Sequence, residues 1–169
     1  MRLFVAVRFN DEMSVSVKGA ADRMRDELPY ARFSRDENFH ITLAFIGEVS
    51  PSRLAACEKA LENIVFDPFD IALSRYGSFS NILWLGLERS DDLAALANSV
   101  RHNLKQSGFA VDEKPFRPHI TLAREADLRG VNFQKAPNTK MTVYEFSLME
   151  SRRERGKLIY DPLFTFKSK

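Results

Sequence analysis

The sequence lacks the features that stabilise secreted proteins or anchor proteins in membranes. Its single cysteine, Cys57, cannot form an internal disulfide and provides no thiolate cluster for zinc. No stretch approaches the roughly 18 consecutive apolar residues that a membrane helix needs. Only five apolar residues in a row precede Arg8, too few for the core of a signal peptide. We therefore expect a cytoplasmic protein without a membrane segment.

The chain also lacks low-complexity segments and linkers rich in proline, glycine and serine. Its 169 residues fit one domain, or two small lobes that pack closely together. Phenylalanine, in contrast, is plentiful, and its 14 residues predict an aromatic-rich core. The formal net charge of +2 permits an anionic ligand but is far below that of a protein that coats nucleic acid in bulk.

Hydrophobic periodicity predicts a mixture of strands and helices. Apolar runs predict strands at residues 3–8, 39–49, 69–74, 82–87, 141–150 and 157–166, and another that begins at His119. Apolar stripes with helical spacing predict helices at residues 11–28, from Ser50 onward, and from a cap at Ser90 or Asp91 to Gly108. Several connections between strands are too short for parallel crossovers, so we expect the α+β class with mostly antiparallel sheets.

The pentapeptide HITLA occurs twice, beginning at His40 and at His119. Each copy is a predicted strand that follows an earlier strand and a long amphipathic helix. The repeat therefore comprises a strand, a helix and a strand, and it indicates two lobes related by approximate twofold symmetry. We expect a single domain over residues 1–169, in which these two intertwined lobes, flanked by helices, enclose a central cleft.

Because successive side chains of a strand point to opposite faces, the residues of each copy are assigned to two faces. The apolar side chains are predicted to face the core: Ile41, Leu43, Phe45, Ile120 and Leu122. The polar side chains and the alanines that follow them are predicted to face the cleft: His40, Thr42, Ala44, His119, Thr121 and Ala123. Each strand would thus present an imidazole and a hydroxyl about 7 Å apart, beside a small residue that leaves room for a ligand.

Two imidazoles and two hydroxyls around one volume suit a phosphoryl group. One histidine can be a general base and the other a general acid, because the unperturbed pKa is about 6.5. Threonine hydroxyls can donate to phosphate oxygens as negative charge develops. A lone histidine in a strand is more often structural, and it is the repeated pairing that favours catalysis. A zinc site is the alternative, but zinc normally needs a third protein ligand, and no HExxH pattern supplies one.

The motifs HITL at 40–43 and HITL at 119–122 resemble the duplicated H-x-T-x signature of the two-histidine (2H) phosphoesterases. The chain is similar in particular to the bacterial and archaeal RNA 2′,3′-cyclic phosphodiesterases, also called 2′–5′ RNA ligase-like proteins. The resemblance extends over nearly the whole chain through MRLFVAV, ENFHITLAFIGEV, ILWLGL, PFRPHITLAR and ESRRERGKLIYDPL.

The resemblance implies that the protein opens 2′,3′-cyclic phosphate ends of RNA to 2′-phosphates, with no metal and no cofactor. It implies that His40 donates a proton to the 3′-oxygen and that His119 accepts a proton from water. Thr42 and Thr121 are implied to bind phosphate oxygens, and Arg124 matches an arginine that lies near the phosphate. Some members also join tRNA halves through a 2′–5′ bond. We expect RNA with a cyclic phosphate end as the partner, and a monomer.

Several assignments stay open. Strict alternation places Arg124 on the face opposite His119, so a twist or the strand end must redirect it. Trp84 can pack in the core or line the cleft. The charged segment 151–156 is predicted to be a hairpin turn, either simply solvated or in contact with RNA phosphates. The alternative functions are hydrolysis of another cyclic or small nucleotide, and binding of nucleotide or RNA without turnover.

Overall fold

The structure is a computed structural model that describes all residues, Met1 to Lys169. One antiparallel sheet contains β1 (Arg2–Val7), β3 (Ile41–Glu48), β8 (Glu145–Glu154) and β9 (Lys157–Lys167). The other contains β2 (Arg32–Phe33), β4 (Phe69–Phe79), β5 (Ile82–Leu87), β6 (His119–Arg124) and β7 (Lys140–Val143). The helices are α1 (Asp11–Arg25), α2 (Leu54–Glu62) and α3 (Asp91–Gln106), with 3-10 turns at Asp36–Asn38 and Pro51–Arg53. The predicted α+β class with antiparallel sheets is confirmed.

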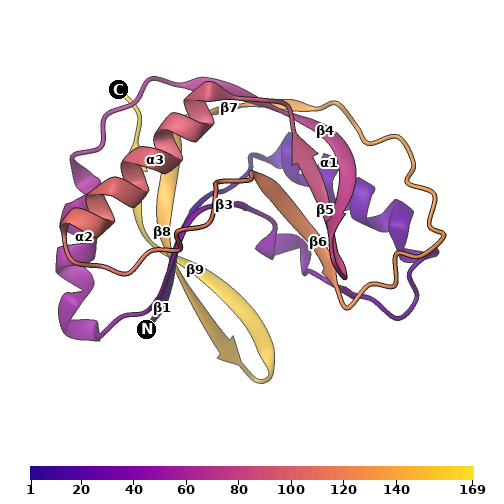
Figure 1. Ribbon diagram of the computed structural model, residues 1–169, viewed down its shortest axis with the longest axis horizontal. Helices are drawn as coiled ribbons and strands as arrows, with labels where there is room; N and C mark the ends of the chain where they lie inside the picture. The colour runs from indigo at the N-terminus through magenta and orange to yellow at the C-terminus, as the bar shows by residue number, and fades with distance from the viewer.

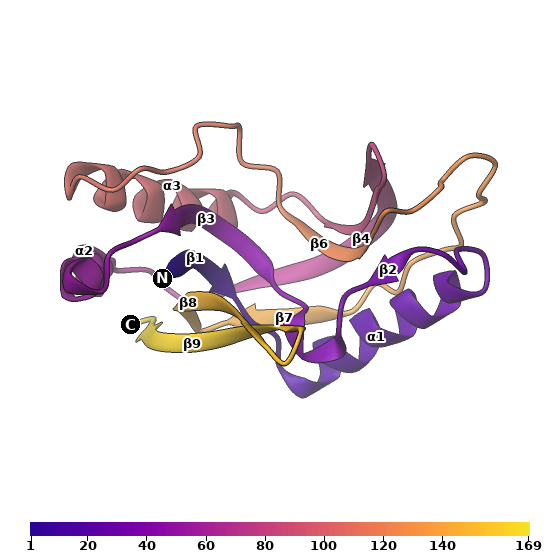
Figure 2. The same cartoon turned by 90° about the horizontal axis from the view of Figure 1, so that it is seen from below.

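The two sheets repeat one arrangement. Their strand orders are β3-β1-β8-β9 and β6-β5-β4-β7, and β2 is added at the outer edge of β6. In each sheet the HITLA strand lies next to the strand that begins its repeat, β1 or β5. The strands β3 and β6 approach each other across the middle of the molecule (Figure 2). The two HITLA strands therefore meet where the lobes face each other.

The helices cross from one lobe to the other. The helix α1 follows β1 in the chain but packs on the second sheet, where the Tyr76 hydroxyl donates to the carbonyl of Ala20 at 2.8 Å. The helix α3 follows β5 but packs on the first sheet, where Arg101 Nε donates to the carbonyl of Leu43 at 3.1 Å. Figure 1 shows α2 and α3 beside β1, β8 and β9, and α1 on the side of β4, β5 and β6. One continuous cluster of 40 buried residues joins both sheets.

Two sequence predictions near the C-terminus are wrong. The predicted strand at residues 141–150 is two strands, because the chain leaves the second sheet after Val143 and enters the first sheet at Glu145. Both sheets bury residues of this segment in the same core, so the apolar pattern continues across the crossing. The predicted turn at residues 151–156 is only Arg155 and Gly156, whose φ angles of 51° and 79° are those of a type I′ hairpin.

Smaller differences concern the ends of elements. The first helix ends at Arg25, before residue 28, because Pro29 has no N–H to bond the Arg25 carbonyl as a continued helix would require. The helix expected from Ser50 begins as a 3-10 turn. The two-residue strand β2 was too short to leave a periodic signal. The third helix begins after its Ser90 cap and ends before Gly108, whose φ of 84° lies in the left-handed region, as expected.

Candidate active site

Both HITLA strands contribute to one cleft with a volume of about 1050 Å³. His40 and Thr42 line it from β3 and the residue before it, and His119 and Thr121 line it from β6. All four side chains are partly buried. The sequence prediction that the two copies face each other across a cleft therefore agrees with the structure.

The two imidazoles are anchored in the same way. His40 Nδ1 lies 2.7 Å from the carbonyl oxygen of Asn38, and His119 Nδ1 lies 2.7 Å from that of Arg117. A carbonyl oxygen can only accept, so Nδ1 carries the hydrogen in both rings. This leaves Nε2 as the nitrogen available to a ligand in each case. His40 Nε2 lies 2.9 Å from the Thr42 hydroxyl oxygen.

The surroundings of the two rings differ. The His40 ring lies 5.1 Å from Phe4 and 5.3 Å, edge to face, from Tyr160. Burial lowers the pKa of His40 below its ordinary 6.5; the Asn38 carbonyl opposes this effect, and the nearby charges of His119 and Arg124 add to it. His40 is therefore a mainly neutral imidazole near pH 7.

His119 is supported by a second pair of aromatic rings. Phe79 meets it edge to face at 5.0 Å, and Trp84 lies 6.4 Å away. Trp84 is not among the residues that line the cleft. Its ring packs over Gly77, where a Cβ atom would come within 2.2 Å of it. The open question about Trp84 is thus resolved in favour of packing, directly behind a candidate catalytic residue.

A β-bulge in each HITLA strand overturns part of the predicted alternation. Two consecutive residues of β1 pair with Ala44 and Thr42, and two consecutive residues of β5 pair with Ala123 and Thr121. The leucine between the two paired residues of each HITLA strand therefore has no partner of its own, which defines a β-bulge. Beyond the bulge the two faces exchange. Both alanines are fully buried instead of lining the cleft.

The residue after each alanine consequently faces the cleft. Phe45, predicted to be core, is 39% exposed and lines the cleft, with the Arg2 guanidinium 5.0 Å from its ring centre. Arg124 is exposed and also lines the cleft. The bulge at Leu122 is thus the feature that redirects Arg124 to the face of His119.

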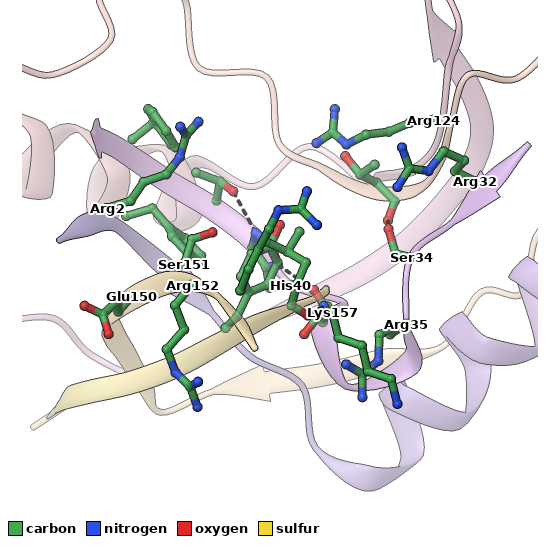
Figure 3. A pocket seen from close by; sticks show the side chains of 18 of the residues that line it. Arg2, Arg32, Ser34, Arg35, His40, Arg124, Glu150, Ser151, Arg152 and Lys157 are labelled. Atoms are coloured by element: carbon green, nitrogen blue, oxygen red, sulfur yellow. Dashed lines mark hydrogen bonds between the residues drawn. The ribbon is translucent and has the colours of Figure 1, made fainter. Parts of the chain in front are cut away.

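The cleft is more cationic than the protein as a whole. Seven of its lining side chains are cationic: Arg2, Arg32, Arg35, Arg124, Arg152, Arg153 and Lys157. Three are anionic: Glu48, Glu125 and Glu150. The lining therefore carries a formal charge of +4, while the complete chain carries +2. Figure 3 shows Arg32 and Arg124 on one side of His40 and Arg2 and Arg152 on the other.

Sequence reasoning missed Asn38, Phe4 and Tyr160. Asn38 is a buried polar residue whose side-chain amide donates to the carbonyl of Leu158 at 2.9 Å, while its own carbonyl holds His40. The only signal for Asn38 in the sequence was its polar side chain just before an apolar strand. Phe4 and Tyr160 carry no such signal, because their approach to His40 depends on strand pairing.

Four other reactive or charged side chains lie outside the cleft lining. His102 is exposed, and Cys57 is fully buried, which raises the pKa of its thiol to about 11. Lys114 does not line the cleft, and Arg117 contributes only its carbonyl. No three side chains of His, Cys, Asp or Glu gather as a metal-ligand set. None of the helices is long and apolar enough to span a bilayer.

Comparison with known proteins gives consistent matches over most of the chain. A protein named RNA 2′,3′-cyclic phosphodiesterase from Archaeoglobus fulgidus is 38% identical over 129 residues, which are 73% of this chain and 72% of that protein. Its namesake from Escherichia coli K12 is 35% identical over 130 residues, 75% and 74% of the two chains. The crystal structure of E. coli LigT complexed with 3′-AMP has a TM-score of 0.87 and 31% identity over 99% of this chain and 97% of that one.

The profile of the 2′-5′ RNA ligase superfamily matches residues 13–155, a span that contains both HITLA strands, the bulges and the first part of the hairpin of β8 and β9. The resemblance stated from the motifs is thereby confirmed. The chain belongs to the 2′-5′ RNA ligase superfamily.

Proposed function

We propose that the protein hydrolyses 2′,3′-cyclic phosphate ends of RNA to 2′-phosphates. The observation that carries this proposal is the matched anchoring of His40 and His119 in one cleft, where a backbone carbonyl holds Nδ1 of each ring and Nε2 is the nitrogen left for a substrate. Two such nitrogens can move one proton in and another out at a single phosphorus atom. The name that the relatives share, and the cationic lining, support a cyclic phosphate on RNA as the substrate.

In the proposed reaction His119 is the general base and His40 the general acid. Nε2 of His119 accepts a proton from a water molecule while the water oxygen forms a bond to phosphorus. The bond between phosphorus and the 3′-oxygen breaks, and this oxygen takes the proton from Nε2 of His40. The phosphate remains on the 2′-oxygen. A later proton exchange with solvent returns both rings to their starting states.

The substrate itself would prepare His40 for the acid role. The pKa of His40 is lowered, mainly by burial, so little of its protonated form is present near pH 7. The negative charge of a bound phosphate diester favours the imidazolium and raises this pKa. Protonation of His40 and binding of the anion are then coupled, and each strengthens the other.

Thr42, Thr121 and Arg124 are the proposed ligands of the non-bridging phosphate oxygens. The hydroxyls can donate hydrogen bonds, and the guanidinium supplies a permanent positive charge as the negative charge on the phosphate oxygens grows. Arg124 has no carboxylate partner, so its charge is available to the phosphate. Joining of RNA ends through a 2′–5′ bond would use the same groups, with a ribose hydroxyl in place of water.

The product of the reaction tests the proposal. A short oligonucleotide with a 2′,3′-cyclic phosphate is incubated with the protein in EDTA and followed by phosphorus NMR. We expect a 2′-phosphate, and a 3′-phosphate would mean that the leaving oxygen is the other one. Binding without product would instead support a binding module, and turnover of other cyclic nucleotides alone would support a different phosphodiesterase. Loss of activity in EDTA would favour a metal-dependent reaction.

The roles of the two histidines can be separated with a modified substrate. A cyclic phosphate with sulfur in place of the 3′-oxygen has a leaving group that needs no proton. His40→Ala and His119→Ala should each lose about 10² to 10⁴ in kcat on the oxygen substrate. On the sulfur substrate His40→Ala should recover most of this loss, and His119→Ala should not. The opposite pattern would reverse the assignment.

A further inference from the structure

We propose that Arg153 and Lys157, on the hairpin of β8 and β9, form a second phosphate site that makes the protein prefer an RNA strand to a mononucleotide. We call this pair the distal site. The inference rests on the proposed function, because the cyclic phosphate between His40 and His119 defines where the strand begins. The site would receive the backbone phosphates upstream of that end.

Strand pairing places Arg153 on the cleft face of the hairpin. Tyr160 lies opposite Ser151, and Leu158 lies opposite Arg153. Residues that lie opposite each other share a face, as do residues two apart along one strand. Tyr160 packs on His40, so this face is the one that faces the cleft. Arg153 therefore continues the wall about 7 Å beyond Ser151, away from the histidines.

Neither cation of the distal site is paired with a carboxylate. Arg153 makes only a 3.3 Å hydrogen bond to the carbonyl of Gly156, and Lys157 has no carboxylate partner although it lines the cleft. Their neighbour Arg152 also lines the cleft, but it pairs with Asp161 at 2.5 Å and with Glu154 at 2.7 Å, so its charge is already matched. Arg153 and Lys157 are therefore the cleft-lining charges of this hairpin that remain available to a phosphate.

The arginines in β2 and just after it are less suited to a second phosphate. Arg32 lies 3.7 Å from Glu125, and Arg35 pairs with Glu37. A phosphate there would have to displace a carboxylate. Toward the hairpin, in contrast, the charges of Arg124, Arg2 and Arg153 all act on the Tyr160 hydroxyl, lowering its pKa against the larger effect of burial.

Tyr160 thus marks the middle of a path of positive charge that leads from the proposed phosphate ligand Arg124 to the distal site. The cleft volume of about 1050 Å³ lies just above the range of roughly 300 to 1,000 Å³ for small-ligand pockets. A flexible strand could follow this path, since single-stranded nucleic acid is bound by grooves that track its backbone charge. A nucleoside 2′,3′-cyclic phosphate has no upstream phosphate and cannot reach the distal site.

The experiment compares Arg153→Gln/Lys157→Gln with Arg155→Gln. Arg155 is in the same hairpin but does not line the cleft, so it controls for a general loss of charge. Affinity is measured by fluorescence anisotropy with a pentanucleotide that ends in a 2′-phosphate, and KM with a cyclic-ended pentanucleotide and with a nucleoside 2′,3′-cyclic phosphate. Binding of the pentanucleotide does not require turnover, so this arm is informative even if the protein catalyses nothing.

We expect the double variant to bind the pentanucleotide about tenfold more weakly, with a salt dependence shallower by about 0.7 per lost contact in the log–log slope. Its KM for the mononucleotide should change less than twofold, and Arg155→Gln should behave as the unaltered protein. Equal pentanucleotide affinity in the unaltered protein and the double variant, or an equal loss in Arg155→Gln, would overturn the distal site. Failure of the proposed function would appear differently, as no turnover by the unaltered protein.

Discussion

At the scale of single residues, the two candidate catalytic histidines are anchored alike but surrounded differently. Both donate from Nδ1 to the carbonyl two residues earlier. His40 lies under Phe4 and Tyr160, where burial lowers its pKa, while the His119 ring lies against Phe79. The same five residues therefore place two imidazoles in unequal surroundings. Such inequality allows two identical groups to take different roles.

The lowered pKa of His40 predicts a specific pH dependence of stability. In the unfolded chain this histidine takes up a proton near its ordinary pKa of 6.5, and the folded protein does so only at lower pH. The free energy of unfolding should therefore fall as the pH drops below 6.5, and His40 should contribute no such slope above it. His40→Gln should lose less stability between pH 7.5 and pH 5 than the unaltered protein in urea titrations. His102→Gln, at an exposed position, is the control and should lose as much.

Gly77 offers a test of the support behind His119. A Cβ atom at this position would lie 2.2 Å from the Trp84 ring, so Gly77→Ala must displace the indole that packs beside His119. We expect kcat to fall by about tenfold and unfolding to cost about 1–3 kcal/mol less, as for other overpacked sites. Gly19→Ala is the matched control, because a Cβ there meets nothing within 4 Å and a helical site favours alanine by about 1 kcal/mol. Normal turnover by Gly77→Ala would contradict the role given to Trp84.

At the scale of elements, the bulges explain why the predicted alternation of side chains failed in part of each HITLA strand. Alternation correctly placed the imidazoles and hydroxyls of both strands, because these precede the bulge. It failed for Phe45 and for both alanines, because an inserted residue depends on the register with β1 and β5 and leaves no trace in the apolar pattern. In the same way, the division of residues 141–150 between two sheets depends on tertiary pairing and not on periodicity.

Asn38 couples the hairpin to the site, since its side chain is bonded to Leu158 and its backbone carbonyl to His40. Asn38→Ala removes the bond to the hairpin and leaves a carbonyl without its donor, at a cost of about 1–3 kcal/mol in stability. We expect kcat to fall by about tenfold while KM for a nucleoside cyclic phosphate stays within twofold. Asn38→Asp has the same size but sets a carboxylate against the Leu158 carbonyl, so it should be the more damaging. An equal fall in thermal stability with unchanged kcat would reduce Asn38 to a structural residue.

At the scale of the whole molecule, the crossing of the helices makes the two lobes interdependent. The first helix packs against the second sheet and the third helix against the first sheet, and their buried faces belong to one core. The sequence predicted the repeat and the class of fold, because both follow from local periodicity. Which sheet each helix covers could not be predicted, since either sheet offers an apolar face of the same kind.

This interdependence predicts that the protein unfolds in one transition. Met24→Ala in α1 and Leu104→Ala in α3 each remove a fully buried side chain, at a cost of about 2–5 kcal/mol. Both should shift a single calorimetric transition to lower temperature, with equal calorimetric and van't Hoff enthalpies. Two separate transitions, only one of which responds to each substitution, would show that the lobes fold independently.

The uneven placement of charge has a consequence for how the protein meets its ligand. A cleft lining of +4 in a chain of +2 leaves −2 for the remainder, so the molecule is an electric dipole and not a uniformly basic body. A polyanion that approaches the wrong side is weakly repelled, while the field turns the open side toward it before any contact forms. Such steering acts over a Debye length of about 8 Å at physiological salt, so added salt should slow the encounter.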